Sequence, residues 1–367
     1  MSLAIYWFIP AHGDGRDVAK SAAGETLTRP PRRDPNVAYL AQVARAADGL
    51  GFTGALVPFG MFCEDPWLVS AALAAQTARL RFMLALRTGL ISPPLVAQMA
   101  ATLQRISGGR LLFNVVTGGD HDEQRRYGDA LPHDERYART AELLEVLDRA
   151  WAGDEFDFRG EHYQVDRGRV VRPYPLRTPV FVGGSSPAAQ AVAARYADVY
   201  LVWGESPAGL AELIGAARRL AEEHGRALAF GTRYHVIARD TAAEAWQVAR
   251  ELLDGMEPSR IREAQARFRR SESVGQRRMS ALTEGAAGLE TYPNIWAGYG
   301  LVRPGAGAAL VGSHDEVADR IAELHGMGID HLILSGQPHL EEVYRFGEGV
   351  LPRLRTRGLL AELEPAR

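Results

Sequence analysis

An arginine and a histidine lie two residues apart in an alternating apolar segment, Phe230 to Ala238. Side chains two positions apart on a strand share a face, so Arg233 and His235 should point to the same side. A buried arginine needs an anionic partner, which can be a structural carboxylate or an anionic substrate. A nearby histidine can exchange a proton near neutral pH, or it can be a satisfied core residue. The spacing therefore indicates an anion site or a structural ion pair.

Polar side chains recur where the predicted strands end. The apolar run His331 to Leu334 is typical of a buried parallel strand, and Ser335, Gln337 and His339 come directly after it. In a (β/α)8 barrel, chemistry takes place at the C-terminal ends of the strands. Loops are usually polar, so one such residue needs no functional explanation. The recurrence of polar residues at several strand ends, however, favours a functional site. The same arrangement follows other strands at His12, Cys63, Arg87, Thr88, Asn114, Thr117 and Trp203.

Cys63 has no sequence signature of a nucleophile around it, so we expect it to line a pocket or pack in the interior. Gly183 and Gly184 precede Ser185 and Ser186 between a strand and a helix. Small residues let backbone amides approach a ligand, and a helix N-terminus favours an anion. The alternative is a tight turn in which a serine caps the helix.

The elements that position these side chains alternate between strand and helix, which predicts a parallel α/β fold. A doubly wound sheet has the same alternation, but no G-x-G-x-x-G motif follows the first strand, so a (β/α)8 TIM barrel is favoured. The helix predicted at Asn36 to Leu50 stops at Gly51, and that at Pro66 to Thr77 begins after Asp65. The eight predicted strands are 3–10, 52–58, 80–86, 110–116, 179–182, 199–202, 230–238 and 331–334.

Two stretches interrupt the alternation of strands and helices within the single barrel domain predicted for residues 1–367. Residues 154–178 are rich in aromatic, charged and proline residues and indicate an insertion. Residues 257–312 are rich in arginine and then in glycine and alanine. Loops this long in compact domains are usually functional or disordered. This second stretch is either a lid over the barrel mouth or a surface excursion that builds a subunit contact.

Composition excludes several classes of function. The net charge of −3 over 367 residues provides no basic field for nucleic acid. No apolar run approaches the roughly 20 residues that cross a bilayer. Cys63 is the only cysteine, so no internal disulfide can form, and we expect a cytoplasmic protein. Neither an H-x-H strand pair nor H-E-x-x-H occurs, so we predict no metal site.

Many short motifs in register resemble one known family. They are Met1 to Asp14, Cys63 to Val69, Phe113 to Asp120, His133 to Tyr137, Phe181 to Ser186, Trp203 to Glu205, Arg233 to Ile237, Glu272 to Gln276, Asn294 to Gly298 and Leu301 to Arg303. Together they closely resemble the FMNH2-dependent alkanesulfonate monooxygenases of the bacterial luciferase-like superfamily. The resemblance runs from residue 1 to about residue 352.

The resemblance implies a (β/α)8 barrel in a two-component system. A separate NAD(P)H-dependent FMN reductase would supply reduced FMN, and the oxygenase would use it with O2 to cleave the C–S bond of an alkanesulfonate, giving sulfite and an aldehyde. It also implies a homodimer or homotetramer and a mobile lid at 257–312. The matching functional positions are His12, Cys63, Arg233, His235, Arg303 and His339, together with Gln337 in the last motif. Those matching the flavin region are Asn114, Thr117, Tyr137, Ser185, Ser186 and Trp203.

Two departures concern the substrate. The family usually has a tyrosine where this chain has Gln337, and a carboxamide cannot yield a proton as a phenol can. The usual polar stretch before the cysteine is replaced by Phe59, Met61 and Phe62. The alternative is therefore the same fold and cofactor acting on a sulfone or other organosulfur compound. A non-catalytic flavin-binding relative is a further alternative, which the retained cationic residues disfavour.

Overall fold

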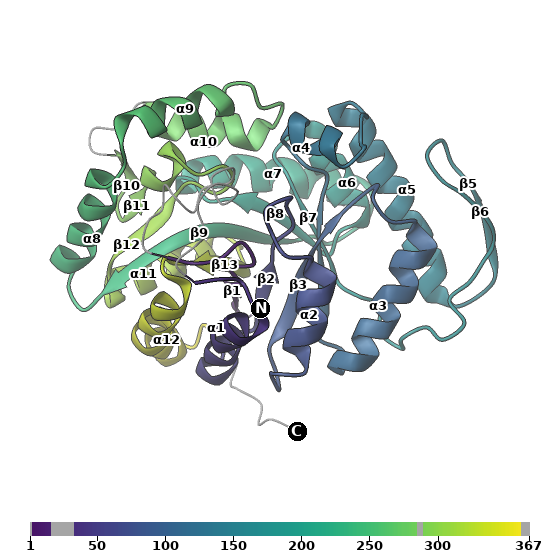
Figure 1. The fold of residues 1–367 in the computed structure, drawn as a ribbon, viewed down its shortest axis with the longest axis horizontal. Helices are drawn as coiled ribbons and strands as arrows, with labels where there is room; N and C mark the ends of the chain where they lie inside the picture. The colour runs from purple at the N-terminus through teal and green to yellow at the C-terminus, as the bar shows by residue number, and fades with distance from the viewer. Residues whose placement is uncertain (1, 16–32, 285–288, 361–367) are drawn as a thin grey trace.

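The computed structural model describes residues 2–15, 33–284 and 289–360. Eight parallel strands form a barrel (Figure 1), in which each strand pairs with the next and β8 pairs with β9 to close the ring. They are β1 (Ala4–Phe8), β2 (Gly54–Val57), β3 (Arg81–Arg87), β4 (Leu111–Val116), β7 (Val180–Gly183), β8 (Val199–Trp203), β9 (Ala229–Arg239) and β13 (His331–Ser335). The predicted TIM barrel is confirmed, and closure excludes the doubly wound sheet.

Helices cover the outside of this barrel, and local sequence signals set their ends. Asn36 accepts a hydrogen bond from the Tyr39 amide at the start of the first helix, and Gly51 ends that helix with a φ of 89°. Asp65 caps the second helix through two backbone amides. No described helix is long and apolar enough to span a bilayer. The helices are α1 (Val37–Leu50), α2 (Pro66–Ala74), α3 (Pro93–Ser107), α4 (His121–Arg126), α5 (His133–Ala152), α6 (Pro187–Tyr196), α7 (Pro207–Glu223), α8 (Ala242–Asp254), α11 (His314–Gly326) and α12 (His339–Thr356).

Alternating strand side chains separate the barrel interior from the layer beneath the helices. Tyr6 and Phe8 belong to the interior cluster, whereas Ile5 and Trp7 pack in the large cluster outside the strands. The interior is close-packed: a Cβ at Gly231 would lie 2.5 Å from a Leu201 methyl group. The barrel is therefore a filled core, and only its ends can hold a ligand.

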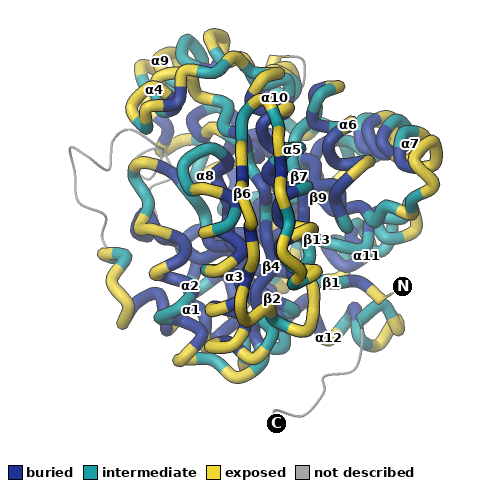
Figure 2. Tube along the Cα trace, turned by 90° about the vertical axis from the view of Figure 1, so that its right-hand side faces the viewer, coloured by how far each residue is buried: buried dark blue, intermediate teal, exposed yellow. Residues whose placement is uncertain are grey.

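The insertion at 154–178 contains a β-hairpin on the outside of the barrel, made of β5 (Phe156–Arg159) and β6 (Gln164–Gly168). Figure 2 shows this hairpin in front of the buried strands, mostly coloured as exposed. Phe158 and Val165 pack with Val146 of α5 in a small cluster. None of the residues predicted to form the site lies in this hairpin.

The excursion at 257–312 is folded, apart from residues 285–288, which lie outside the described residues. Its last strand was not predicted, and it pairs in parallel with the distal half of β9, from His235 to Arg239. Trp296 and Tyr299 pack with Ile237 of β9 in a second core cluster. The elements are α9 (Pro258–Phe268), α10 (Val274–Glu284), β10 (Glu290–Tyr292), β11 (Ile295–Trp296), the 3-10 helix η2 (Gly298–Leu301) and β12 (Ala309–Ser313).

Candidate active site

Two arginines meet at the C-terminal end of the barrel. Arg233 of β9 stacks over the ring of Phe8, with its guanidinium carbon 4.6 Å from the ring centre. Burial, and then the positive charge of Arg303, lower the pKa of Arg233 to about 9, so it remains cationic at neutral pH. Burial also lowers the pKa of Arg303. The predicted convergence of these cations is therefore present in the structure.

Neither arginine is matched by a carboxylate. Among the described residues, no Asp or Glu oxygen lies within 4.0 Å of a nitrogen of Arg233 or Arg303, and the Arg233 Nε is buried without a partner. Arg303 Nη1 instead donates to the side-chain oxygen of Gln337 at 3.0 Å. Unpaired buried cations are costly in a folded protein, so this arrangement suits an anion that arrives from outside.

His235 lies beside this pair, and both of its ring nitrogens are engaged. Nε2 donates to the Ala306 carbonyl at 3.0 Å, so Nδ1 accepts from the Ser335 hydroxyl at 2.9 Å. The ring stacks on Tyr299 at 4.1 Å. Burial, and then the nearby arginines, hold the pKa of His235 well below its usual value. Of the two alternatives for His235, these contacts and the lowered pKa favour the satisfied core residue, and a catalytic role for it stays a prediction.

His12 and Cys63 border the same centre. Burial, and then Arg303, lower the pKa of His12 well below its usual value, and its buried Nε2 has no partner among the described residues. The Phe62 ring lies edge-on to His12 at 6.1 Å. Burial, and then Glu123, raise the pKa of Cys63 to about 12, so the thiol stays protonated and is unsuited to act as a nucleophile.

His339 is the first residue of α12, and Asp14 binds it. The Asp14 carboxylate accepts from the His339 amide at 2.8 Å and from its Nδ1 at 3.1 Å. Burial opposes ionisation of Asp14, but electrostatic attraction to His339 and the hydrogen bonds from His339, Tyr39 and the Gly15 amide outweigh it and hold the pKa of Asp14 well below its usual range. Asp14 and His339 are only 1 % and 2 % exposed. A buried carboxylate thus joins the ends of the first and last barrel strands.

Hydroxyl groups gather beside α6 on the opposite side of the barrel mouth. Burial raises the pKa of Tyr137, and hydrogen bonds from the hydroxyls of Thr117 and Ser186 partly offset this effect. Gly184 has a φ of 139°, and a Cβ there would lie 2.5 Å from the Tyr137 hydroxyl. Ser186 Oγ also accepts from the Ala189 amide at 3.2 Å, so it caps α6. The segment is both a capped turn and a close-fitting polar cradle.

The other predicted flavin-region residues lie along this edge. Asn114 is on β4, and its side-chain oxygen would lie 4.0 Å from a Cβ at Gly183. Ser185 is partly buried and directly precedes the α6 cap. Trp203 ends β8 and pairs with Arg233 in the strand register. The two groups of predicted residues therefore adjoin each other at one end of the barrel.

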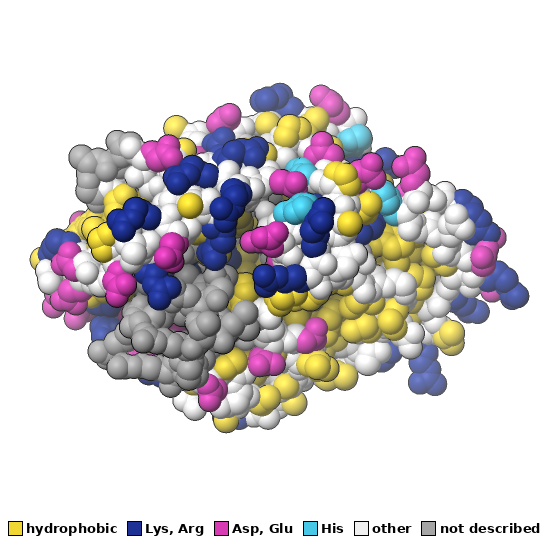
Figure 3. Space-filling model, turned by 45° about the horizontal axis from the view of Figure 1, so that its top comes forward, with side chains coloured by type: hydrophobic (Ala, Val, Ile, Leu, Met, Phe, Trp, Pro, Cys, Tyr) yellow, Lys and Arg dark blue, Asp and Glu magenta, His cyan; other side chains and the backbone are white. Residues whose placement is uncertain are grey.

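Part of the excursion closes over this edge. A Cβ at Gly275 of α10 would lie 3.0 Å from the Trp203 ring. Arg278 of α10 donates to both carboxylate oxygens of Glu205 at 2.8 Å. In Figure 3, basic side chains gather over the region of α9 and α10. The lid interpretation thus agrees with where the excursion packs, and its motion remains a prediction.

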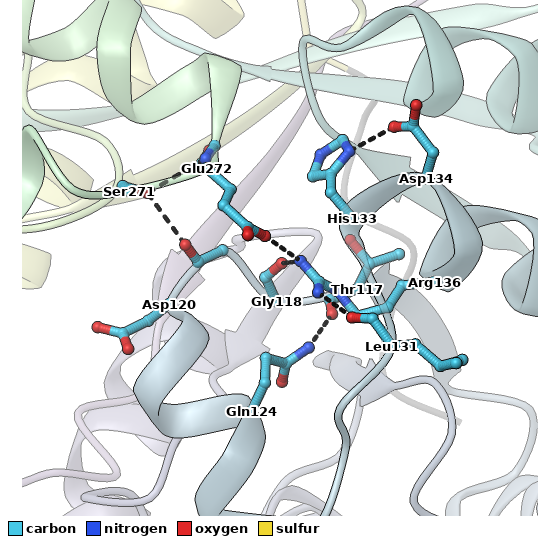
Figure 4. A network of polar contacts seen from close by, with 12 residues as sticks. Thr117, Gly118, Asp120, Gln124, Leu131, His133, Asp134, Arg136, Ser271 and Glu272 are labelled. Atoms are coloured by element: carbon cyan, nitrogen blue, oxygen red, sulfur yellow. Dashed lines mark hydrogen bonds and ion pairs between the residues drawn. The ribbon is translucent and has the colours of Figure 1, made fainter.

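A second connection runs from the excursion to the loop after β4 (Figure 4). Ser271 donates to the Gly119 carbonyl at 3.0 Å. Arg136 of α5 donates to the Leu131 carbonyl at 2.6 Å and reaches Glu272 at 3.4 Å. Because Arg136 is almost fully buried, a charge on the excursion is tied to the helix that carries Tyr137.

The hydroxyl groups of Thr117, Tyr137 and Ser186, together with the start of α6, are suited to bind the phosphate of a flavin nucleotide. These hydroxyl donors and the amides at the start of α6 are the groups that bind phosphate in proteins. Within the described ranges, no group of three His, Cys, Asp or Glu side chains could hold a metal ion. Sequence reasoning placed Ser335 at a strand end but missed Asp14, Arg136 and Arg278 as parts of the site. Asp14 had a signal, since it lies in the loop that follows β1 on the mouth side.

Comparison with known families identifies the chain more closely. The model of the luciferase-like monooxygenase family matches residues 3–331. The chain belongs to this family. Luciferase-like proteins of solved structure share its fold at low identity, which agrees with the barrel described above.

Three such structures have the same fold over nearly their whole length. The riboflavin lyase RcaE is 22% identical, with a TM-score of 0.81 and coverage of 98% of this chain and 93% of its own. The EDTA monooxygenase EmoA from Chelativorans sp. BNC1 is 18% identical, with a TM-score of 0.79 and coverage of 98% and 95%. The long-chain alkane monooxygenase LadA is 19% identical, with a TM-score of 0.78 and coverage of 100% and 94%. Structures of this fold include FMN-dependent and F420-dependent members.

Proposed function

We propose that this luciferase-like protein is the oxygenase of a two-component system that uses reduced FMN and O2 to cleave the C–S bond of an alkanesulfonate, giving sulfite and an aldehyde. The observation that supports it is the buried pair Arg233 and Arg303, which no carboxylate of the described residues matches. A sulfonate is a permanent anion whose oxygens accept charge-assisted hydrogen bonds from arginine. The family resemblance of the sequence motifs supports the same substrate class.

In this proposal Thr117, Tyr137 and Ser186 bind the phosphate of reduced FMN, and Asn114 and Trp203 border the rest of the cofactor. Bound reduced FMN would supply the electrons that activate O2. The contacts of α10 with Trp203 and Glu205 would exclude water from the reacting groups. The protein thus contributes binding, orientation and a dry cationic environment.

The proposal includes a separate NAD(P)H-dependent FMN reductase as partner, and a homodimer or homotetramer in solution. Sedimentation at several concentrations tests the oligomeric state. Titration of the oxygenase against a flavin reductase tests whether free reduced FMN suffices or a complex of the two proteins forms.

The deciding experiment measures sulfite. The purified protein is supplied with FMN, NADH, a flavin reductase, O2 and a panel of linear and aromatic sulfonates. We expect sulfite and the matching aldehyde, with none when FMN, the reductase or O2 is left out or when F420 replaces FMN. If the protein binds reduced FMN but releases no sulfite from any sulfonate, the proposal that its substrate is an alkanesulfonate is refuted.

A sulfone or another organosulfur compound is the second candidate. Gln337 favours it, because its oxygen occupies one donor of Arg303 and leaves fewer donors for the oxygens of a sulfonate. Phe62 also presents an apolar ring next to His12, whereas Phe59 stacks on Arg87 instead, with 4.9 Å between the guanidinium carbon and the ring centre. Mass spectrometry of the products from matched sulfonates and sulfones separates the two candidates.

Gln337→Tyr should raise kcat/KM for short alkanesulfonates by about tenfold or more, because a phenol releases Arg303 and narrows the site around a small guest. Steady-state sulfite release with substrates of increasing chain length is the measurement. Gln337→Phe is the matched control, since it has the same shape without a hydroxyl. Equal gains in both variants would assign the effect to volume alone, and no gain in either would remove Gln337 as a determinant of specificity.

A further inference from the structure

The three histidines of the site differ in which ring nitrogens are free. His235 uses both nitrogens within the protein. His12 has a buried Nε2 without a partner, and burial and nearby cations keep its ring neutral. His339 is bound through Nδ1 only, and within the described part of the chain its Nε2 has no hydrogen-bonding partner. Only His339 therefore combines a fixed ring with a free nitrogen.

Asp14 is what fixes that ring. An ionised carboxylate only accepts hydrogen bonds, so Nδ1 of His339 must carry a hydrogen. A neutral ring then has its lone pair at Nε2. This arrangement suits an acceptor of protons.

Further contacts hold Asp14 in its orientation. The Tyr39 hydroxyl donates to Asp14 Oδ2, and the Gly15 amide donates to Oδ1 at 2.8 Å. Arg33 donates to the Tyr39 hydroxyl at 3.4 Å and to Glu341 at 2.8 Å. A buried carboxylate with donors on both oxygens has little freedom to turn, so its direction is set before any substrate binds.

The His339 ring adjoins the proposed anion site. Its centre lies 5.5 Å from the centre of the Phe8 ring, and the guanidinium carbon of Arg233 lies 4.6 Å from the centre of the same ring. Gln337, which binds Arg303, is only two residues before His339. A substrate carbon next to a bound sulfonate group would therefore lie close to this histidine.

We propose that His339 is the residue that accepts a proton from the substrate and that Asp14 is its positioning residue. This proposal rests on the proposed function. In that reaction FMNH2 and the substrate are oxidised while O2 is reduced. One oxygen atom enters the aldehyde and the other leaves as water. The C–S electron pair leaves with sulfite, the substrate carbon loses one proton to His339 Nε2, and the imidazolium then releases that proton to water.

The first test needs no substrate. Proton–nitrogen NMR of the histidine side chains, with His339→Gln to assign the signals, reports which nitrogen carries the hydrogen. We expect a hydrogen on Nδ1 of His339 in the wild-type protein, and loss of this fixed state in Asp14→Asn. A wild-type ring with hydrogen on Nε2 alone would overturn the positioning role. Identical histidine spectra for the wild-type protein and Asp14→Asn would also overturn the positioning role.

The second test is kinetic. Asp14→Asn and His339→Gln should each lower kcat by about 100- to 10,000-fold, with little change in KM, because the lost group acts in the chemical step. Tyr39→Phe keeps the carboxylate and should give a smaller loss, so it serves if Asp14→Asn does not fold. Undiminished kcat in His339→Gln would overturn the proposal.

Asp48→Asn is the matched control. Its carboxylate also accepts from backbone amides, those of Ala78, Arg79 and Leu80, but it lies at the other end of the barrel. We expect lower stability with unchanged histidine spectra and kcat. If no sulfonate is turned over while the NMR result holds, the proposed function and the proton transfer fail together, and the Asp14–His339 positioning stands.

Discussion

Replacing Arg233 by methionine should weaken binding of a small alkanesulfonate by about 2–4 kcal/mol, or about 30- to 1,000-fold in Kd. The same change should leave the protein as stable as the wild type or raise its free energy of unfolding. The reason is that Arg233 is a buried cation that pairs with no carboxylate in the part of the chain that the structure describes, so its burial costs free energy until an anion binds. Calorimetric titration with the sulfonate and urea unfolding without it measure the two effects.

Arg110 offers a control with the opposite outcome. It also stacks on a buried aromatic ring, that of Phe82, with 5.6 Å between the guanidinium carbon and the ring centre. Its guanidinium donates to the carbonyls of Ser107, Leu80 and Ala74. Arg110→Met should therefore lower stability by leaving these acceptors unsatisfied, and should leave sulfonate affinity unchanged.

If Arg233→Met loses stability as Arg110→Met does, while its affinity for sulfonate stays at the wild-type value, Arg233 is a structural residue. That result would remove the main support for an anionic substrate. It would leave the family assignment untouched, since the match to the luciferase-like monooxygenases does not depend on this side chain.

All eight barrel strands could be predicted because each is a short apolar run followed by polar residues, and this pattern is local. Their ends agree with the structure to within two residues. The additional strand β12 could not be predicted in this way. Its residues, Ala309 to Ser313, continue a Gly/Ala-rich stretch, and their strand conformation comes from pairing with the distal half of β9.

The roles of the histidines depended on contacts that are remote in the sequence. His235 was correctly placed next to Arg233 by strand alternation. Its partners Ser335 and Ala306 are 100 and 71 residues away, so its satisfied state could not be seen. Asp14 lies in a Gly-Asp-Gly sequence that is typical of a turn, and its contact with His339 spans 325 residues. Local patterns predicted which residues meet, and only the fold shows which of their atoms are free.

The buried histidines should make the protein unstable in mild acid. Burial, and then Arg81, lower the pKa of His331 to about 4, compared with 6.5 in an unfolded chain. Between these values the unfolded state binds the extra proton, so the free energy of unfolding falls as the pH falls. His331 alone accounts for a loss of roughly 3 kcal/mol between pH 7 and pH 4. His12 and His235 act in the same direction, and Glu342 opposes them because burial raises its pKa.

Urea unfolding at several pH values between 7.5 and 4.5 measures this dependence. His331→Gln removes a ring that accepts from the Tyr6 hydroxyl at 3.2 Å and packs edge-on against Phe181 at 5.1 Å, so it should be less stable than the wild type at neutral pH. The free energy of unfolding of this variant should nevertheless fall less steeply as the pH falls. Its slope against pH should be smaller by the equivalent of up to one bound proton. His224→Gln, at an exposed position at the end of α7, should follow the wild-type slope. Parallel curves for His331→Gln and the wild type would mean that His331 has the same pKa in the folded and unfolded states, and the acid sensitivity would then have to come from other groups such as His12 and His235.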